Sequence, residues 1–327
     1  MGYYHCLSRV VDRRFIFGDA ERERFVELMR EYERFCGVRV LTFCVMSNHF
    51  HMLVEVAKAP EIKPTAEEIR ERLRELTGCQ DAGAAWQELE GYRQANDQKA
   101  EAEWLERYYA RMWDVSAFMK LVKQRFTQWY NRRSGRRGTL WEDRFKSVLV
   151  EGAGEALVTM AAYIDLNPVR AGMVADPKAY RWSGYGEAVA GKRLARNGLQ
   201  RVVGAMRGRE ETLTKAMELY RMRLFNQGHE ENEAVLEDGR TSRGALAHEE
   251  VMRVLEQRGR LPVGDYVRCR VRYFCDGGVF GSRAFVDEIF RAYRDRFGPK
   301  RETGARRLRG VEAELYALRD LRANVFG

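Results

Sequence analysis

The chain has 327 residues, of which 45% are hydrophobic, so it is long enough for two domains with a sizeable core and too apolar to be disordered. It carries 57 Lys and Arg against 48 Asp and Glu, and this net charge of +9 is compatible with a polyanionic partner such as nucleic acid. No apolar run reaches the ~20 residues of a membrane helix, the N-terminus lacks a signal-peptide core, and the six cysteines show no metal-binding spacing; we therefore expect a reduced, cytoplasmic protein with no membrane partner.

The first sixth of the chain predicts a strand, a helix and a β-hairpin. Residues 3–11 are strand-like, and residues 19–37 place apolar side chains at helical spacing. Asp19 is a candidate cap for this helix, and Gly37 is a natural stop. Residues 38–56 then form two strands that are joined by a tight Ser-Asn-His turn.

The segment CVMSNHFHMLVEV (44–56), which contains the second strand of this hairpin, holds two histidines two residues apart. Side chains alternate along a strand, so His49 and His51 lie on one face, while Phe50, Met52 and Val54 lie on the other. Taken alone, two imidazoles on one face favour a structural role in the core or at the surface over half a metal site.

The next elements complete a recognisable order. Residues 58–112 are charged and helical, and we interpret them as an insertion at the surface. An amphipathic helix over 114–135, a strand over 138–152 and a helix over 154–174 follow, with the last helix ending near Pro168. The order strand, helix, two strands, helix, strand, helix predicts an α+β fold with a ferredoxin-like or RRM-like antiparallel sheet.

The rest of the chain, residues 188–327, is expected to be a mostly α-helical accessory region after a first domain over 1–187. The acidic stretch 229–244 is typical of a linker. The segment 273–298 resembles a helix-turn-helix, in which the helix from Ser282 would enter a DNA groove. The alternative is a plain helical packing domain with a basic tail.

A second feature is a stretch in which basic and aromatic side chains alternate. Basic groups neutralise phosphates and aromatic rings stack on unpaired bases, so this stretch is a candidate DNA-binding surface. Its candidate contacts are Lys123, Arg125, Arg132, Arg133, Arg136, Arg137, Trp141, Arg144 and Lys146. The alternative is a solvated basic helix whose aromatic residues belong to the core.

A third feature is the pair Tyr163 and Asn167, which lie four residues apart in AAYIDLNPVRAG. If the helix persists through its last turn, both side chains share one face. Tyr163 then offers a phenolic nucleophile and Asn167 an amide oxygen. Alternatively, Tyr163 is a core aromatic and Asn167-Pro168 only ends the helix.

Four segments, in this order, resemble the REP-associated tyrosine transposases, which belong to the single-tyrosine HUH (His-hydrophobic-His) class: YYHCLSRVVDRRFIF, FCVMSNHFHMLVE, LWEDRFKSVLV and YIDLNPVRAGMV. The resemblance covers residues 1–185 apart from the insertion. It implies an HUH nuclease domain in which His49 and His51 bind Mg²⁺ or Mn²⁺, Tyr163 is the nucleophile and Asn167 completes the metal site.

The reaction implied by this resemblance is phosphoryl transfer on single-stranded DNA beside a hairpin. Tyr163 would form a 5′-phosphotyrosine link and release a 3′-hydroxyl, and attack by another 3′-hydroxyl would join strands. A rival interpretation is a domesticated DNA-binding protein that keeps the fold without cutting. A small-molecule phosphohydrolase using His-x-His accounts for neither the arginines nor Tyr163. The sequence leaves monomer and homodimer as alternatives.

Overall fold

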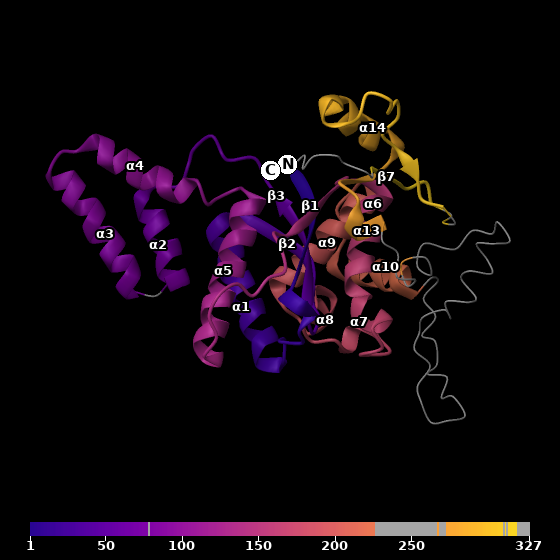
Figure 1. Ribbon diagram of the computed structural model, residues 1–327, viewed down its shortest axis with the longest axis horizontal. Coiled ribbons are helices and arrows are strands. Elements are labelled where there is room, and N and C mark those ends of the chain that lie inside the picture. Colours follow the sequence, from indigo (N-terminus) through magenta and orange to yellow (C-terminus); the bar gives the residue numbers. More distant parts are fainter. Residues whose placement is uncertain (78, 226–266, 268–272, 310, 312, 319–327) are drawn as a thin grey trace. The chain divides into compact units, whose positions relative to one another are not determined.

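The computed structural model describes residues 1–77, 79–225, 267, 273–309, 311 and 313–318 (Figure 1). The chain divides into two compact units. The helical unit comprises Met1 and residues 16–39 and 55–140, and the sheet unit comprises residues 2–15, 40–54 and 141–327. All residues of the pocket described below lie in the sheet unit.

The described residues form a sheet of seven strands in the order β2-β3-β1-β4-β5-β7-β6. The first four were expected from the sequence, and they are β1 (Gly2–Arg9), β2 (Val38–Val45), β3 (His49–Val56) and β4 (Lys146–Val150). β1 pairs with β4 in antiparallel register, with His5 opposite Val148. The order β2-β3-β1-β4 is that of the split βαβ arrangement, so the predicted α+β, ferredoxin-like class is confirmed.

Three strands that the sequence did not predict extend this sheet: β5 (Val279–Gly281), β6 (Arg306–Arg307) and β7 (Tyr316–Leu318). β5 runs parallel to β4, with Leu149 opposite Val279, and β7 pairs antiparallel with β5. Strands of two or three residues are too short to show an alternating pattern. Val279 and Phe280 are nevertheless fully buried, which is the physical reason for their place in the sheet.

The expected helix-turn-helix is corrected by this finding. The helix after Ser282 exists as α14 (Arg283–Ala292), and the Ser282 side chain accepts a hydrogen bond from the backbone N–H of Phe285 as its N-cap. However, the segment before it is strand β5 and not a turn between two helices. The predicted linker 229–244 lies outside the described residues.

The helical unit contains α1 (Asp19–Cys36), α5 (Val115–Ser134) and the three helices of the expected insertion, α2 (Ala66–Thr77), α3 (Cys79–Gln94) and α4 (Gln98–Tyr109). α1 begins at Asp19 with Gly18 as its cap, and it ends at Gly37, whose φ of 63° is left-handed as a glycine stop requires. Within this unit, α1 and α5 share an aromatic cluster in which Phe25 and Phe126 meet edge to face with ring centroids 5.2 Å apart.

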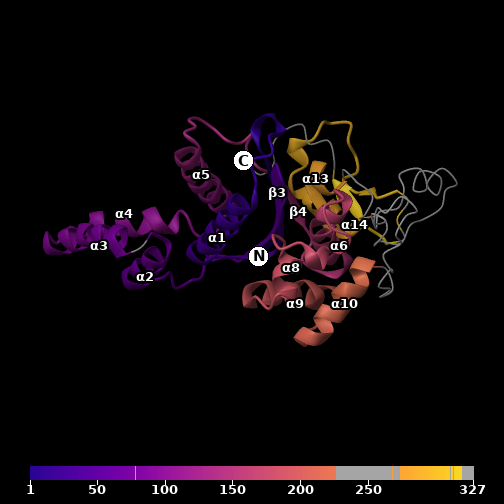
Figure 2. The same cartoon turned by 90° about the horizontal axis from the view of Figure 1, so that it is seen from below.

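The sheet unit has its core around α6 (Gly154–Asp165), which is buried along ten of its twelve residues. It is followed by α7 (Asn167–Arg170), α8 (Gly184–Val189), α9 (Arg193–Arg207), α10 (Leu213–Phe225) and, beyond the residues that are not described, α13 (Tyr273–Asp276). Figures 1 and 2 show α9 and α10 grouped beside α6. Leu157 and Val202 share one hydrophobic core, so this core includes residues on both sides of residue 187. The boundary between two domains at residue 187 stays a prediction.

Candidate active site

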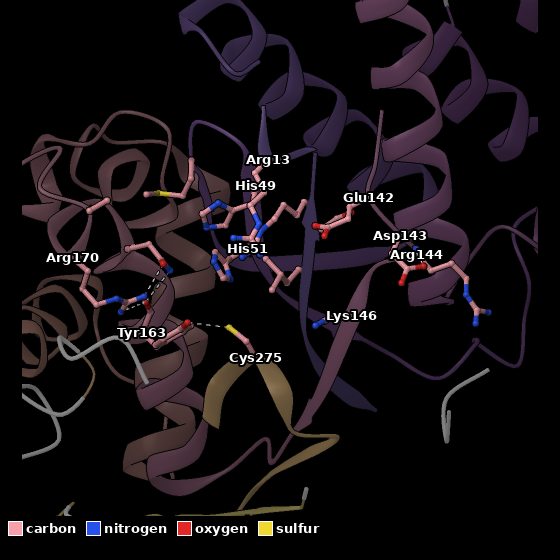
Figure 3. Close-up of a pocket in the computed structure, with 16 residues that line it drawn as sticks. Arg13, His49, His51, Glu142, Asp143, Arg144, Lys146, Tyr163, Arg170 and Cys275 are labelled. Carbon is pink, nitrogen blue, oxygen red and sulfur yellow. Dashed lines mark hydrogen bonds between the residues drawn. The ribbon is translucent and has the colours of Figure 1, made fainter. Parts of the chain in front are cut away.

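The histidine pair comes from the start of β3, directly after the turn that joins it to β2. The backbone N–H of Met46 donates to the carbonyl of His49 over 2.8 Å, which closes this hairpin. The imidazole centroids of His49 and His51 lie 5.1 Å apart, and both rings line the same pocket (Figure 3). The predicted placement of the two histidines on one strand face is confirmed.

A third histidine, His5 on β1, lies beside this pair. Its Nε2 atom is 2.9 Å from Nδ1 of His51, and the two rings stack with centroids 5.1 Å apart. Its Nδ1 atom is 2.7 Å from the backbone carbonyl oxygen of Phe274. Sequence reasoning missed His5. The signal available was a histidine in the first strand, but only the pairing of strands shows that it meets His51.

The three imidazoles are neutral at pH 7. Burial lowers the pKa of His5 to about 4 and that of His49 to about 4, and burial also lowers the pKa of His51 well below its usual value. The guanidinium of Arg170 lowers all three further, and Arg9 does so for His49 and His51. Neutral imidazole is the form that binds a metal ion, so protons do not compete for these rings at neutral pH.

Tyr163 projects from α6 toward the histidines. Its ring centroid is 5.9 Å from that of His51 and 6.0 Å from that of His5, in edge-to-face geometry. Its hydroxyl lies 3.0 Å from Sγ of Cys275, as the dashed line in Figure 3 marks. The C-terminal region therefore supplies a side chain to the pocket, where the sequence predicted none.

Asn167 and Arg170 lie one and two turns beyond Tyr163. The Asn167 amide donates to the carbonyls of Tyr163 and Ile164, each over 3.1 Å, and its Oδ1 accepts from Arg170 over 2.7 Å. Asn167 is thus in the same pocket as the histidines and Tyr163, as its spacing predicts. Its amide oxygen keeps one lone pair beyond the Arg170 bond.

These residues line a pocket of about 1000 Å³ whose rim is mainly basic. The charged residues that line it are Arg9, Arg13, Arg144, Lys146 and Arg170, against Glu142 and Asp143 (Figure 3). Such an excess of positive charge around a hollow attracts polyanions. Two of the predicted DNA contacts, Arg144 and Lys146, are therefore at the pocket.

The rim loop of β1 is held in an unusual backbone conformation. Asp12 and Arg13 have φ values of 56° and 54°, in the left-handed region that side chains other than glycine rarely adopt. The Asn48 amide donates to the Arg13 carbonyl over 3.0 Å, and Oδ1 of Asn48 lies 2.7 Å from Nδ1 of His49. A strained loop beside a pocket is common at functional sites, and here one side chain connects it to His49.

The nitrogen and oxygen donors of the pocket decide which ions it can hold. Within the described part of the chain, neither Nε2 of His49 nor Nε2 of His51 has a hydrogen-bond partner, so both lone pairs are available. Two imidazoles and an amide oxygen leave coordination positions open for phosphate and water, which fits Mn²⁺ or Mg²⁺. Among the described residues, no group of three or more His, Cys, Asp or Glu side chains is placed to hold a metal ion, so the proposed site depends on the Asn167 oxygen as its third protein ligand.

Two of the predicted DNA contacts are buried and are corrected here. Trp141 is 7% exposed and its ring packs edge to face against Phe50, with centroids 5.5 Å apart, so it has no open face for a base. Lys123 is 9% exposed, within the buried side of α5. Trp141 follows the alternative interpretation, in which the aromatic residues belong to the core, whereas the burial of Lys123 fits neither interpretation.

The remaining predicted contacts lie in the helical unit, on α5 and the turn after it. Arg125 donates to the hydroxyl of Tyr32 over 2.9 Å, and Arg136 donates to the carbonyl of Thr139 over 2.8 Å. Arg132, Arg133 and Arg137 are exposed. Their contact with DNA stays a prediction.

No helix in the described ranges has both the length and the apolar character needed to cross a membrane. A comparison with curated proteins gave no match. Residues 1–111 match the family model described as "Transposase IS200 like". Among solved structures, one of a REP-associated tyrosine transposase bound to a REP hairpin is similar at 14% identity and a TM-score of 0.36, over 58% of this chain and 80% of that one. The resemblance to transposases that the sequence motifs indicate is therefore confirmed over residues 1–111, which hold the histidine pair.

Proposed function

We propose that this protein is a metal-dependent nuclease and strand transferase that cuts single-stranded DNA beside a hairpin through a 5′-phosphotyrosine intermediate. One observation carries the proposal: His49 and His51 on β3 and Tyr163 on α6 line one pocket with a basic rim. The motifs of the sequence supply the substrate class, since their resemblance implies hairpin DNA.

The roles of the residues follow from their chemistry. His49 and His51 would hold Mg²⁺ or Mn²⁺, with Asn167 as a further ligand. When bound, such an ion polarises the scissile phosphate and stabilises the charge that develops on its oxygens. Arg144 and Lys146 would hold the neighbouring phosphates by charge.

Tyr163 would attack the phosphorus, so that the bond from its oxygen to phosphorus forms while the bond from phosphorus to the 3′-oxygen breaks. The phenol loses its proton and the departing 3′-oxygen gains one. The covalent link conserves the phosphodiester energy, and a later attack by a 3′-hydroxyl reverses the step without a nucleotide cofactor.

A second candidate function is DNA binding without cutting. The observation that favours it is that the proposed nucleophile and the proposed amide ligand already have hydrogen-bond partners. The Tyr163 hydroxyl lies 3.0 Å from Sγ of Cys275, and Arg170 donates to the Asn167 oxygen. In this interpretation the pocket holds DNA but the nucleophile does not react.

The experiment that decides is adduct formation on a labelled hairpin with a single-stranded flank, in Mn²⁺, read on a denaturing gel. Wild type should form a protein–DNA adduct, and Tyr163→Phe should bind the DNA without forming one. Cys275→Ala is the matched control because it removes a second nucleophilic group that lies 3.0 Å from this hydroxyl. An adduct that survives Tyr163→Phe but not Cys275→Ala would assign the nucleophile to sulfur, and no adduct in wild type would favour the binding-only function.

A further inference from the structure

Resting on the proposed metal site, we infer that His5 and Asn48 are positioning residues that set the tautomers of the two metal-binding histidines. Each connects one histidine to a backbone carbonyl: Phe274 through His5 to His51, and Arg13 through Asn48 to His49. Together they direct both Nε2 lone pairs into the pocket.

With all three imidazoles neutral, the first connection has only one consistent arrangement of protons. A carbonyl oxygen cannot donate, so Nδ1 of His5 carries the proton in its 2.7 Å bond to Phe274. In a neutral imidazole the other nitrogen is then the acceptor. Nε2 of His5 must accept, and Nδ1 of His51 must donate, in the 2.9 Å bond between them. Nε2 of His51 is therefore left with its lone pair.

The second connection is decided in the same way. The Arg13 carbonyl can only accept, so the amide NH₂ of Asn48 faces it at 3.0 Å and the amide oxygen faces His49. An amide oxygen also only accepts, so Nδ1 of His49 donates to it over 2.7 Å. Nε2 of His49 is again the nitrogen without a proton.

Burial makes the partner of His51 important. His5 is 1% exposed and His51 2% exposed, so water does not replace a lost partner without rearrangement. Without His5, the His51 ring would be free to carry its proton on Nε2 and would then present N–H, not a lone pair, to the ion. Second-sphere partners of this kind typically change metal affinity by about 10- to 100-fold.

His5 thus has a role that a purely structural core residue would not have, and this role depends on the C-terminal region. Phe274 lies on α13, and its carbonyl is the fixed end of the longer connection. The histidine pair on β3 is thus oriented by β1 and by a segment more than two hundred residues further along the chain.

The test uses the full-length protein labelled with ¹⁵N-histidine and free of metal. Long-range ¹⁵N–¹H spectra report which ring nitrogen carries the proton, and single His→Gln variants assign the five histidines. We expect the Nδ1–H tautomer for His5, His49 and His51. An Nε2–H tautomer at His51 in wild type would overturn the inference, whether or not the protein cuts DNA.

Two variants at residue 5 then separate positioning from packing. Glutamine can donate to the Phe274 carbonyl and accept from His51, whereas leucine fills similar space and can do neither. Calorimetric titration with Mn²⁺ should show affinity about 10- to 100-fold weaker for His5→Leu and much closer to wild type for His5→Gln, with thermal unfolding as the check that both fold.

Equal Mn²⁺ affinity for wild type and a folded His5→Leu variant would overturn the inference. If His5→Leu does not fold, a His5→Gln variant that has lost affinity although folded would overturn it as well. If wild type shows the expected tautomers yet binds no Mn²⁺, the proposed function fails instead, because the tautomers are measured without metal.

Discussion

The guanidinium of Arg170 lies over the ring of Tyr163, with its central carbon 4.2 Å from the ring centroid. The same side chain donates to the backbone carbonyls of Tyr163 and Val267, over 2.9 and 2.7 Å, and to the oxygen of Asn167. One residue therefore holds the proposed nucleophile, its backbone and the proposed amide ligand. A cation over an aromatic ring contributes about 0.5–2 kcal/mol, more when water is excluded.

We predict that Arg170→Gln slows adduct formation at saturating DNA by about tenfold or more, since about 1.4 kcal/mol of lost positioning is a factor of ten. Arg170→Lys is the matched control, because it keeps the charge but not the planar fork that reaches three acceptors at once. It should fall between wild type and the glutamine variant. The measurement is the single-turnover rate of the covalent adduct, and an unchanged rate in Arg170→Gln would contradict this role.

The lowered pKa values of the buried histidines predict a stability that falls on acidification. Below pH 6.5 these histidines are protonated in the unfolded chain, whereas in the folded protein they stay neutral until the pH approaches about 4. The free energy of unfolding therefore falls as the pH is lowered through this range. Each such histidine should cost about 2 kcal/mol between pH 7 and pH 5.

The check is urea unfolding of wild type and His5→Gln at both pH values. The variant lacks one of these groups, so acidification should destabilise it by about 2 kcal/mol less than wild type. His229→Gln is the control variant for removing a histidine elsewhere in the chain. If wild type and His5→Gln lost the same free energy of unfolding on acidification, the pKa of His5 would not be lowered in the folded protein.

The basic rim of the pocket predicts a defined salt dependence of DNA binding. Each phosphate contact on a single strand contributes about 0.7 to the slope of log K against log salt. Replacing Arg144 and Lys146 together by alanine should therefore reduce the slope by up to about 1.4. The control pair is Lys99 and Lys215, which are exposed and do not line the pocket. Equal slopes for both double variants would assign Arg144 and Lys146 to ordinary solvated surface.

The turn after α5 permits the same measurement in the helical unit. Replacing the exposed residues Arg132, Arg133 and Arg137 by alanine should reduce the slope by up to about 2 if each meets a phosphate. Arg136 is left in place because its bond to the Thr139 carbonyl holds the turn together. A slope equal to that of wild type would remove this turn from the DNA-binding surface.

Local patterns in the sequence were enough to find the centre of the site. The alternation of side chains along a strand places His49 and His51 together, and helical spacing brings Tyr163 and Asn167 to one pocket. His5 could not be found in this way, because its meeting with His51 depends on which strands pair and in which register. Cys275 depends likewise on how the C-terminal region joins the sheet.

The two errors among the predicted DNA contacts have a common physical cause. The prediction for Trp141 and Lys123 rests on residue type alone, since an aromatic ring and a positive charge suit DNA. In the structure, however, both side chains are buried. Composition describes what a side chain is able to bind, whereas exposure decides whether it can. The short strand β5 was missed because three residues carry no measurable period, although full burial of Val279 and Phe280 gives it a firm place.

One buried carboxyl remains outside the pocket's chemistry. Asp165, at the end of α6, is 1% exposed and accepts hydrogen bonds from the hydroxyls of Thr42 and Tyr220 and from the backbone N–H of Tyr185. Burial raises its pKa to about 6, although these three donors act in the opposite direction. The folded protein therefore binds this proton more tightly than the unfolded chain does.

We predict that Asp165 makes the protein relatively more stable in acid. Its contribution is fully present below the ordinary value of 3.8 and is lost as the pH rises through about 6, by up to roughly 3 kcal/mol. Over this pH range the histidines change the free energy of unfolding in the opposite direction. The contribution of Asp165 is therefore measured as a difference between two proteins that share these histidines. Asp165→Asn cannot titrate, so the stability difference between wild type and this variant should shift against wild type by about that amount from pH 4 to pH 7. Urea unfolding at both pH values measures the difference, and a difference that is constant with pH would show that Asp165 is ionised throughout, held so by its three donors.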